Sequence, residues 1–177
     1  RGLGDVYKGR IQGAENTRSV SMKDMLYHTE IVAKACKQAL VIADMPFHSY
    51  EKAQTALANA KELINNGANM VKLEGGSENT EVIKALVFND INGCGHIGLQ
   101  PQLVVDSSGY KVQGRDKDSA QTILDNAKIL DSLGVSILVL ECVPSNLAKS
   151  ITNSVTIPTI GIGAGKECDG QVLVSYD

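Results

Sequence analysis

The sequence predicts an α/β protein built on a parallel β-sheet. Short, nearly continuous apolar runs recur along its 177 residues, as expected of strands that are buried on both faces. Segments in which apolar residues follow the helical period separate these runs. Because a strand–helix–strand alternation joins strands that run in the same direction, the pattern indicates a parallel sheet with covering helices.

Six apolar runs are the predicted strands, at residues 39–43, 69–73, 94–99, 135–140, 159–162 and 171–174, and residues 2–5 fit the end of another strand. Two arrangements satisfy the alternation, an open doubly wound sheet and a closed barrel. A full (βα)8 barrel typically takes ~250 residues. The count therefore fits one barrel domain over residues 1–177 that is incomplete at both ends, lacking its first strand or two and everything after its eighth.

Capping signals mark the first two predicted helices. Ser21 and Asp24 have the spacing of a capping box at the start of the first helix. Ser49 is the predicted N-cap of the second helix, which Gly67 closes.

Three further helices are expected between the later strands. A shorter helix is predicted at residues 81–89, and the next follows Asp118 and ends at Gly134. Pro144 suits the first turn of a last helix that runs through Ile151.

Composition excludes several classes of function. The formal net charge of −3 argues against binding along a nucleic-acid backbone. No run approaches the ~20 apolar residues that a membrane helix needs, and no segment resembles a secretion signal. The four cysteines lack the close spacing of a zinc or redox motif. We therefore expect a cytoplasmic protein with free thiols.

The connection at residues 100–117 is long for a compact α/β protein. It follows the carboxyl end of a predicted strand, where functional loops are common. A plain surface excursion is the alternative interpretation.

Polar residues occur at the ends of four successive predicted strands. Asp44 follows the first apolar run, and Lys72 and Glu74 lie at the end of the second. His96 lies within the third run and Glu141 follows the fourth. Because the carboxyl ends of parallel strands converge on one crevice or barrel mouth, we expect these five side chains to share a pocket.

Several clustered carboxylates repel one another, and a divalent cation such as Mg²⁺ relieves that repulsion. An ammonium at Lys72 would suit an anionic substrate, and a carboxylate outside the metal shell could act as a general base. Each residue also has a structural explanation: Asp44 as a helix cap, Lys72 reaching solvent, and His96 as a hydrogen-bonded core histidine. The coincidence at four strand ends favours the functional interpretation.

Six segments resemble the ketopantoate hydroxymethyltransferase family in order and spacing. They are ADMPF (43–47), NMVKLEGG (69–76), GHIGLQPQ (95–102), GYKVQGR (109–115), LECVP (140–144) and GIGAG (161–165). The shorter matches YHT (27–29) and IQG (11–13) extend the resemblance over nearly the whole chain.

The resemblance implies a (βα)8 TIM barrel of the phosphoenolpyruvate/pyruvate type whose first strand and C-terminal helices are missing from this chain. It implies transfer of a hydroxymethyl group from the co-substrate 5,10-methylenetetrahydrofolate to 3-methyl-2-oxobutanoate, which gives 2-dehydropantoate for pantothenate synthesis. It also implies a homo-oligomer, commonly a decamer, whose partners are small-molecule substrates.

The resemblance also implies roles for individual residues. Glu141 would be the catalytic base; Asp44, Lys72 and His96 would bind substrate; and Asp5, Asp44 and Glu74 would hold Mg²⁺. One departure is Val6, where the family usually has a serine directly after the first metal-ligand aspartate.

Two alternatives remain beside this prediction. One is a Mg²⁺-dependent lyase of the same barrel superfamily that acts on 2-oxo acids. The other is a catalytically inactive relative that binds a 2-oxo acid, which Val6 favours and the retained Asp44, Lys72 and Glu141 count against.

Overall fold

A six-stranded parallel sheet forms the centre of the molecule in the computed structural model, which describes residues 17–104 and 110–174. The strands are β1 (Ile42–Asp44), β2 (Met70–Glu74), β3 (Gly93–Gly98), β4 (Ile137–Glu141), β5 (Thr159–Ile162) and β6 (Gly170–Gln171). Each strand pairs in parallel with the one before it in the chain. A doubly wound sheet reverses its strand order at a switch point, so the described strands exclude that arrangement.

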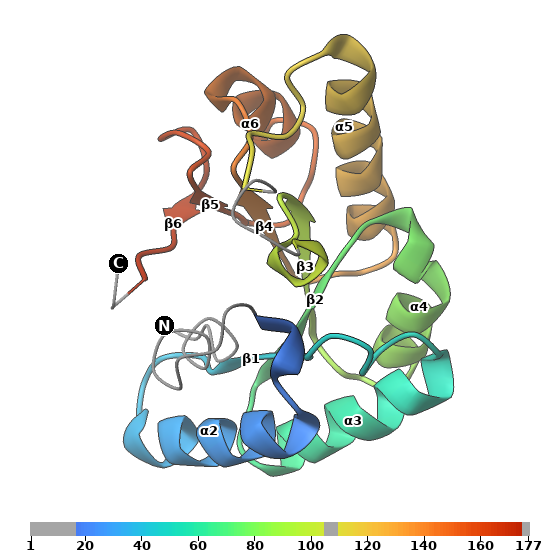
Figure 1. Cartoon of the computed structure of the whole chain (residues 1–177), viewed down its shortest axis with the longest axis vertical. Helices are drawn as coiled ribbons and strands as arrows, with labels where there is room; N and C mark the ends of the chain where they lie inside the picture. Colours follow the sequence, from blue (N-terminus) through green and yellow to red (C-terminus); the bar gives the residue numbers. More distant parts are fainter. Residues whose placement is uncertain (1–16, 105–109, 175–177) are drawn as a thin grey trace.

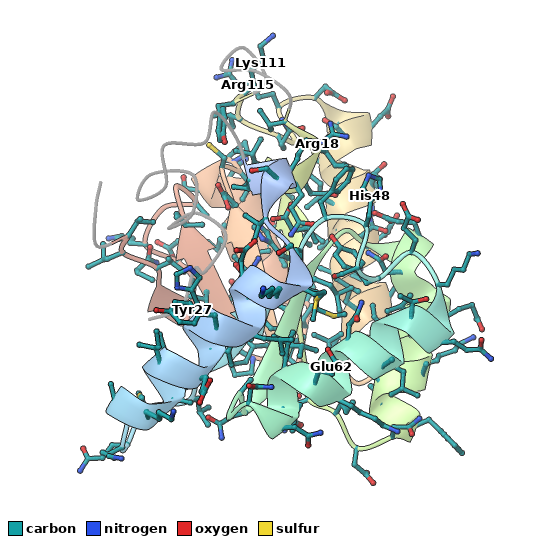
Figure 2. The ribbon with its side chains drawn as sticks, turned by 60° about the horizontal axis from the view of Figure 1, so that its bottom comes forward. Arg18, Tyr27, His48, Glu62, Lys111 and Arg115 are labelled. Carbon is teal, nitrogen blue, oxygen red and sulfur yellow. The ribbon has the colours of Figure 1, made fainter. Side chains whose placement is uncertain are left out.

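Five α-helices alternate with the strands and form an arc around them (Figure 1). They are α2 (Met22–Ala35), α3 (Ala53–Asn65), α4 (Thr80–Phe88), α5 (Lys117–Ser132) and α6 (Ser145–Thr152), with short 3-10 turns η1 (Thr17–Ser19), η2 (Ser77–Asn79) and η3 (Pro101–Leu103). Their outer faces carry exposed side chains such as Tyr27 of α2 and Glu62 of α3 (Figure 2). The parallel α/β prediction is confirmed.

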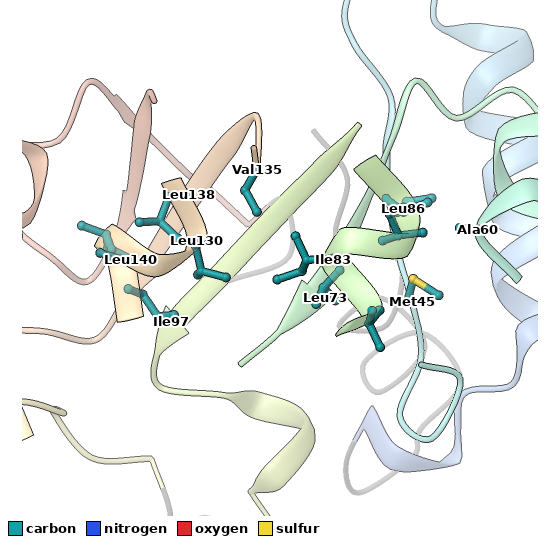
Figure 3. Close-up of a cluster of buried hydrophobic side chains, with 14 of the residues drawn as sticks. Met45, Ala60, Leu73, Ile83, Leu86, Ile97, Leu130, Val135, Leu138 and Leu140 are labelled. Carbon is teal, nitrogen blue, oxygen red and sulfur yellow. The ribbon is translucent and has the colours of Figure 1, made fainter. Parts of the chain in front are cut away.

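The main hydrophobic core lies between the sheet and the helices (Figure 3). Leu63 of α3, Leu86 of α4 and Leu130 of α5 are at most 1% exposed there and pack with Leu73 of β2. Side chains alternate between the two faces of a strand. The neighbours of the core residues therefore point to the opposite face of the sheet.

A smaller apolar cluster covers part of that opposite face. Met70, Cys94 and Val139 form it, with half-buried isoleucines around them. Two residues further along β2 and β3 are Lys72 and His96, which the pleat puts on the same face. The sheet thus has an apolar floor below a row of polar side chains at its carboxyl edge.

Two helix starts differ from the predicted ones. The capping box of Ser21 and Asp24 is confirmed at α2. Helix α3, however, has Lys52 and not Ser49 at its N-cap position, without a side-chain capping bond. The chain first forms a turn in which the Ser49 amide donates to the Pro46 carbonyl. Helix α5 begins earlier than predicted, because the Asp116 side chain accepts the amide of Ser119.

The last helix and the two outer strands also shift. Pro144 is the N-cap of α6 and not part of its first turn. Strand β1 begins at Ile42, not at residue 39, because the preceding backbone pairs with the side chain of Asn69. Strand β6 ends at Gln171 instead of continuing to residue 174, since it is paired on one side only among the described strands.

Candidate active site

Five polar side chains converge at the carboxyl edge of the sheet, as predicted. Asp44 ends β1, Lys72 and Glu74 lie at the end of β2, His96 lies in β3, and Glu141 ends β4. The register aligns the neighbours directly, since Asp44 is opposite Lys72 and Glu74 is opposite His96. Four of these residues are at most 5% exposed, while the Glu141 side chain keeps 18% of its surface accessible.

Lys72 lies at the centre of the group. Its Nζ is 3.3 Å from Asp44 Oδ1 and 3.9 Å from Glu74 Oε1. The side chain is only 5% exposed, so it does not extend to solvent, and the two carboxylates offset the cost of burying its charge. Within residues 17–104 and 110–174, two carboxylates share this one ammonium, an arrangement that also suits a divalent cation.

His96 connects Lys72 to Glu141. The Lys72 ammonium lies 3.3 Å from His96 Nδ1, and because an ammonium can only donate, Nδ1 accepts and the ring proton is assigned to Nε2. His96 Nε2 lies 3.1 Å from Glu141 Oε2. The two atoms are close, although their contact does not have the geometry of a hydrogen bond. His96 is thus buried, as its structural explanation predicted, but its contacts are Lys72 and Glu141.

Glu74 is held by a residue to which the sequence reasoning assigned no role. Its Oε2 accepts the backbone amide of Gln102 at 2.9 Å. Gln102 belongs to η3, in the connection after β3, and is 1% exposed. Gln102 is the last residue of the segment GHIGLQPQ that resembles the family, but the resemblance does not reveal its contact with Glu74.

The predicted metal ligands are described in part. Asp44 and Glu74 are within 4 Å of the same ammonium, whereas Asp5 and its neighbour Val6 lie outside the described residues. Among residues 17–104 and 110–174, no three His, Cys, Asp or Glu side chains are placed to hold a metal ion together. Two buried carboxylates nevertheless fit Mg²⁺, which is often bound by one or two carboxylates and otherwise by water and substrate oxygens.

The backbone around Glu141 is fixed by close contacts. The Leu99 amide donates to the Glu141 carbonyl at 2.8 Å, and the Cys142 amide donates to the Ile162 carbonyl at 2.8 Å. Cys142 has a left-handed φ of 53°, an unusual conformation for a residue with a side chain. The next strand and the loop after β3 thus hold the direction in which Glu141 leaves the sheet.

Cys94 lies in the apolar floor beside Lys72 and Asp44. Burial raises the pKa of its thiol to about 12, against a smaller opposing effect of the nearby Lys72 charge. A thiol that keeps its proton is a poor nucleophile. All four cysteines are free, as predicted.

The long connection after β3 contacts Glu74 through Gln102 and approaches Glu141 again near its other end. The Gln113 amide donates to the carbonyl of Cys142, and Lys111 and Arg115 lie at one end of the molecule (Figure 2). A cavity of about 400 Å³ opens between this connection, α5 and α6. None of the five converging residues lines it, so it is not part of the candidate site.

No helix in the described parts of the chain has the length and apolar character needed to cross a membrane.

Comparison with known proteins identifies close relatives in sequence. A model of the family described as ketopantoate hydroxymethyltransferase matches residues 3–177. The 3-methyl-2-oxobutanoate hydroxymethyltransferase of Ruthia magnifica subsp. Calyptogena magnifica is 56% identical over 99% of this chain and 67% of its own length. That of Vesicomyosocius okutanii is 58% identical over the same shares. The chain thus spans about two thirds of the length of these relatives.

Solved structures of low sequence identity share the fold. A 2,3-dimethylmalate lyase, a PEP mutase/isocitrate lyase superfamily member, matches with a TM-score of 0.63 at 13% identity, over 89% of this chain and 57% of that chain. An oxaloacetate acetylhydrolase in complex with 3,3-difluorooxalacetate matches with a TM-score of 0.65 at 15% identity, over the same shares. The described sheet and helices therefore have the architecture of part of those folds.

Proposed function

The chain belongs to the ketopantoate hydroxymethyltransferase family, and on that basis we propose that it transfers a hydroxymethyl group from 5,10-methylenetetrahydrofolate to 3-methyl-2-oxobutanoate. The product would be 2-dehydropantoate, a precursor in pantothenate synthesis. The observation that carries the proposal is the contact between His96 and Glu141 at 3.1 Å. It places a partly accessible carboxylate beside the buried side chains of Asp44, Lys72, Glu74 and His96.

The proposed substrate is an anion, and the site offers positive charge where it would bind. Lys72 presents an ammonium that is buried between Asp44 and Glu74. With a cation bound by those two carboxylates and by Asp5, Lys72 would be released to contact the carboxylate of the oxo acid. A bound magnesium ion would supply Lewis acidity at the oxo-acid oxygens.

Glu141 is the proposed general base. Its side chain is accessible enough to reach a bound substrate, and it would take the proton from C3 of the oxo acid. The electron pair of that C–H bond then forms the enolate. His96 would hold the carboxylate in place through Nε2 and, because Lys72 occupies its Nδ1 side, would stay in one tautomer.

The second half of the reaction joins two carbons. The enolate carbon attacks the one-carbon unit carried by folate, and both bonds from that unit to the two folate nitrogens are broken. The proton taken from C3 and one proton of water end on those nitrogens. Water supplies the hydroxyl oxygen, so oxo acid, methylenetetrahydrofolate and water give 2-dehydropantoate and tetrahydrofolate. We propose the connection at residues 100–117 as one surface for folate, since its Gln113 contacts the residue after Glu141.

The remaining features of the proposal concern the whole protein. We propose a closed (βα)8 barrel, supported by strands that pair in chain order and by the likeness to a PEP mutase/isocitrate lyase superfamily member. We also propose a homo-oligomer in the cytoplasm, and four free cysteines suit a reducing compartment.

The proposal is tested by proton exchange in the full-length protein. We expect deuterium from D2O to enter C3 of 3-methyl-2-oxobutanoate, followed by proton NMR, when Mg²⁺ is present. Replacing Glu141→Gln removes the base and should slow exchange by about 10²–10⁴-fold. Glu62→Gln, an exposed position on α3, is the matched control and should leave the rate unchanged.

The same assay separates the alternatives. Exchange followed by formation of 2-dehydropantoate on addition of methylenetetrahydrofolate supports the transferase. Carbon–carbon cleavage of a larger 2-oxo acid would instead identify a lyase. A folded protein that binds metal and oxo acid without exchange would be the inactive relative.

A further inference from the structure

Gln102 is a polar residue in a loop, yet it is 1% exposed and bonded at both ends of its side chain. Its Nε2 donates to the carbonyl of Met45 at 2.9 Å. Its Oε1 accepts the hydroxyl of Tyr50 at 2.7 Å. Both partners belong to the connection after β1, so Gln102 joins the loops that follow β1 and β3.

The backbone of the same residue contacts the candidate site. The Gln102 amide donates to Glu74 Oε2 at 2.9 Å. The other oxygen, Oε1, lies 3.9 Å from Lys72 Nζ and 4.0 Å from His96 Nδ1. The two oxygens of Glu74 are therefore unlike, one bound to the loop and the other facing the site.

The main chain of Glu74 is held as well. Its carbonyl accepts the side-chain amide of Asn79 at 2.9 Å and lies 3.4 Å from the Tyr50 hydroxyl. With the main chain fixed on β2, the hydrogen bond from the Gln102 amide is one of the contacts that set the direction of the carboxylate. That amide in turn depends on the two side-chain bonds of Gln102, because η3 has only three residues.

We propose that Gln102 is a positioning residue that orients Glu74, so that Glu74 offers the single oxygen Oε1 to a divalent cation. The inference rests on the proposed function for the presence of that cation. It adds a residue that touches neither substrate nor metal and acts through Glu74. Partners that orient a metal ligand typically change metal affinity by 10–100-fold when removed.

The primary test replaces Gln102→Met, which keeps the length of the side chain and removes both of its hydrogen bonds. We expect the dissociation constant for Mn²⁺, measured by electron paramagnetic resonance of the full-length protein with 3-methyl-2-oxobutanoate present, to rise at least tenfold. Tyr50→Phe removes one of the two bonds and should raise the constant by less. It also keeps the proposal testable if the first variant does not fold.

Thr159→Val is the matched control. Thr159 is fully buried and hydrogen-bonded through its side chain to Thr152 and Asp169. It is the first residue of β5, at the amino end of the strand, whereas the candidate site lies at the carboxyl ends of the strands. The change should lower thermal stability without changing the Mn²⁺ constant. An unchanged constant in Gln102→Met, or an equal rise in Thr159→Val, would overturn the proposal.

A crystal structure of the Gln102→Met variant without metal separates this inference from the proposed function. We expect Glu74 to leave the backbone amide at position 102 and to turn its carboxylate. Retention of the 2.9 Å contact seen here would refute the positioning role whether or not the protein binds metal. A different outcome is that Glu74 turns in the variant while the unaltered protein does not bind Mn²⁺. That outcome would contradict only the metal site of the proposed function.

Discussion

At the scale of single residues, Lys72 is the charge on which the candidate site depends. It lies between Asp44 and Glu74 and beside His96. Removing one member of a buried ionic group leaves the others without compensation, which costs more than the group contributes as a whole. The stability of this edge of the sheet and its affinity for cations are therefore linked through one side chain.

Replacing Lys72→Met should lower the free energy of unfolding by about 3–5 kcal/mol without metal, because two buried carboxylates then face one another. Mg²⁺ should restore part of that loss, and thermal unfolding with and without Mg²⁺ measures both effects. Lys149→Met removes a more exposed pair with Glu167 at 3.6 Å and should cost about 1 kcal/mol or less. Equal losses in the two variants would contradict the central role of Lys72.

The thiol of Cys94 gives a prediction for pH. Burial raises the pKa of the Cys94 thiol to about 12. In the unfolded chain a cysteine thiol has a pKa of about 8.5. The unfolded chain therefore loses this proton first, and rising pH should destabilise the fold from about pH 8.5 up to the folded pKa. In the Cys94→Ala variant, the free energy of unfolding should fall less steeply as the pH rises. Urea unfolding between about pH 7 and about pH 10 measures this dependence.

At the scale of elements, Gly98 ends β3 where it passes closest to the backbone of Glu141. Its φ is 93°, and a Cβ there would lie 2.2 Å from the Glu141 carbonyl oxygen. Gly98→Ala should therefore destabilise the protein by about 1–3 kcal/mol and should lower the C3 exchange rate by displacing Glu141.

Gly93 provides the control within the same strand. It begins β3, and a Cβ built on it meets nothing within 4 Å. Gly93→Ala should leave both the unfolding temperature and the exchange rate near those of the unaltered protein. If it proves as harmful as Gly98→Ala, the loss reflects strand glycines in general and not contact with Glu141.

The helices and strands show what local pattern can predict. Apolar runs and helical periods located six strands and five helices, because burial on one or both faces imposes those spacings. Starts and ends were less predictable. Ser49 was wrong as an N-cap because the chain uses it in a turn, and Asp116 was missed because it precedes the first apolar position by four residues.

At the scale of the whole molecule, the candidate site was predictable to the extent that topology alone creates it. Parallel strands bring their carboxyl ends together, so Asp44, Lys72, Glu74, His96 and Glu141 had to lie close to one another. The contact of Gln102 with Glu74 has no such signal, because it joins two loops whose paths depend on side-chain packing. The left-handed Cys142 was equally unpredictable, since nothing in its residue type requires that conformation.

The core between sheet and helices should dominate global stability. Leu130 of α5 is fully buried and packs toward β3. A Cβ atom built on Gly95 of that strand would lie 3.1 Å from the Leu130 side chain. Leu130→Ala should cost about 2–5 kcal/mol in denaturant unfolding, through lost burial and the cavity left behind. Leu173→Ala removes a side chain that is 88% exposed and should change stability by about 0.5 kcal/mol or less. Similar costs would mean that α5 does not contribute to the main core.

The strand order has a consequence for how the chain is made. Each strand from β2 to β6 pairs with the strand that was synthesised just before it. The strand with which each new strand pairs has therefore already left the ribosome. Because only one connection separates the two strands, the entropic cost of closing the loop between them is low. The sheet can therefore grow in the direction of translation, and the strands that carry Asp44, Lys72 and Glu74 can pair before Glu141 is made.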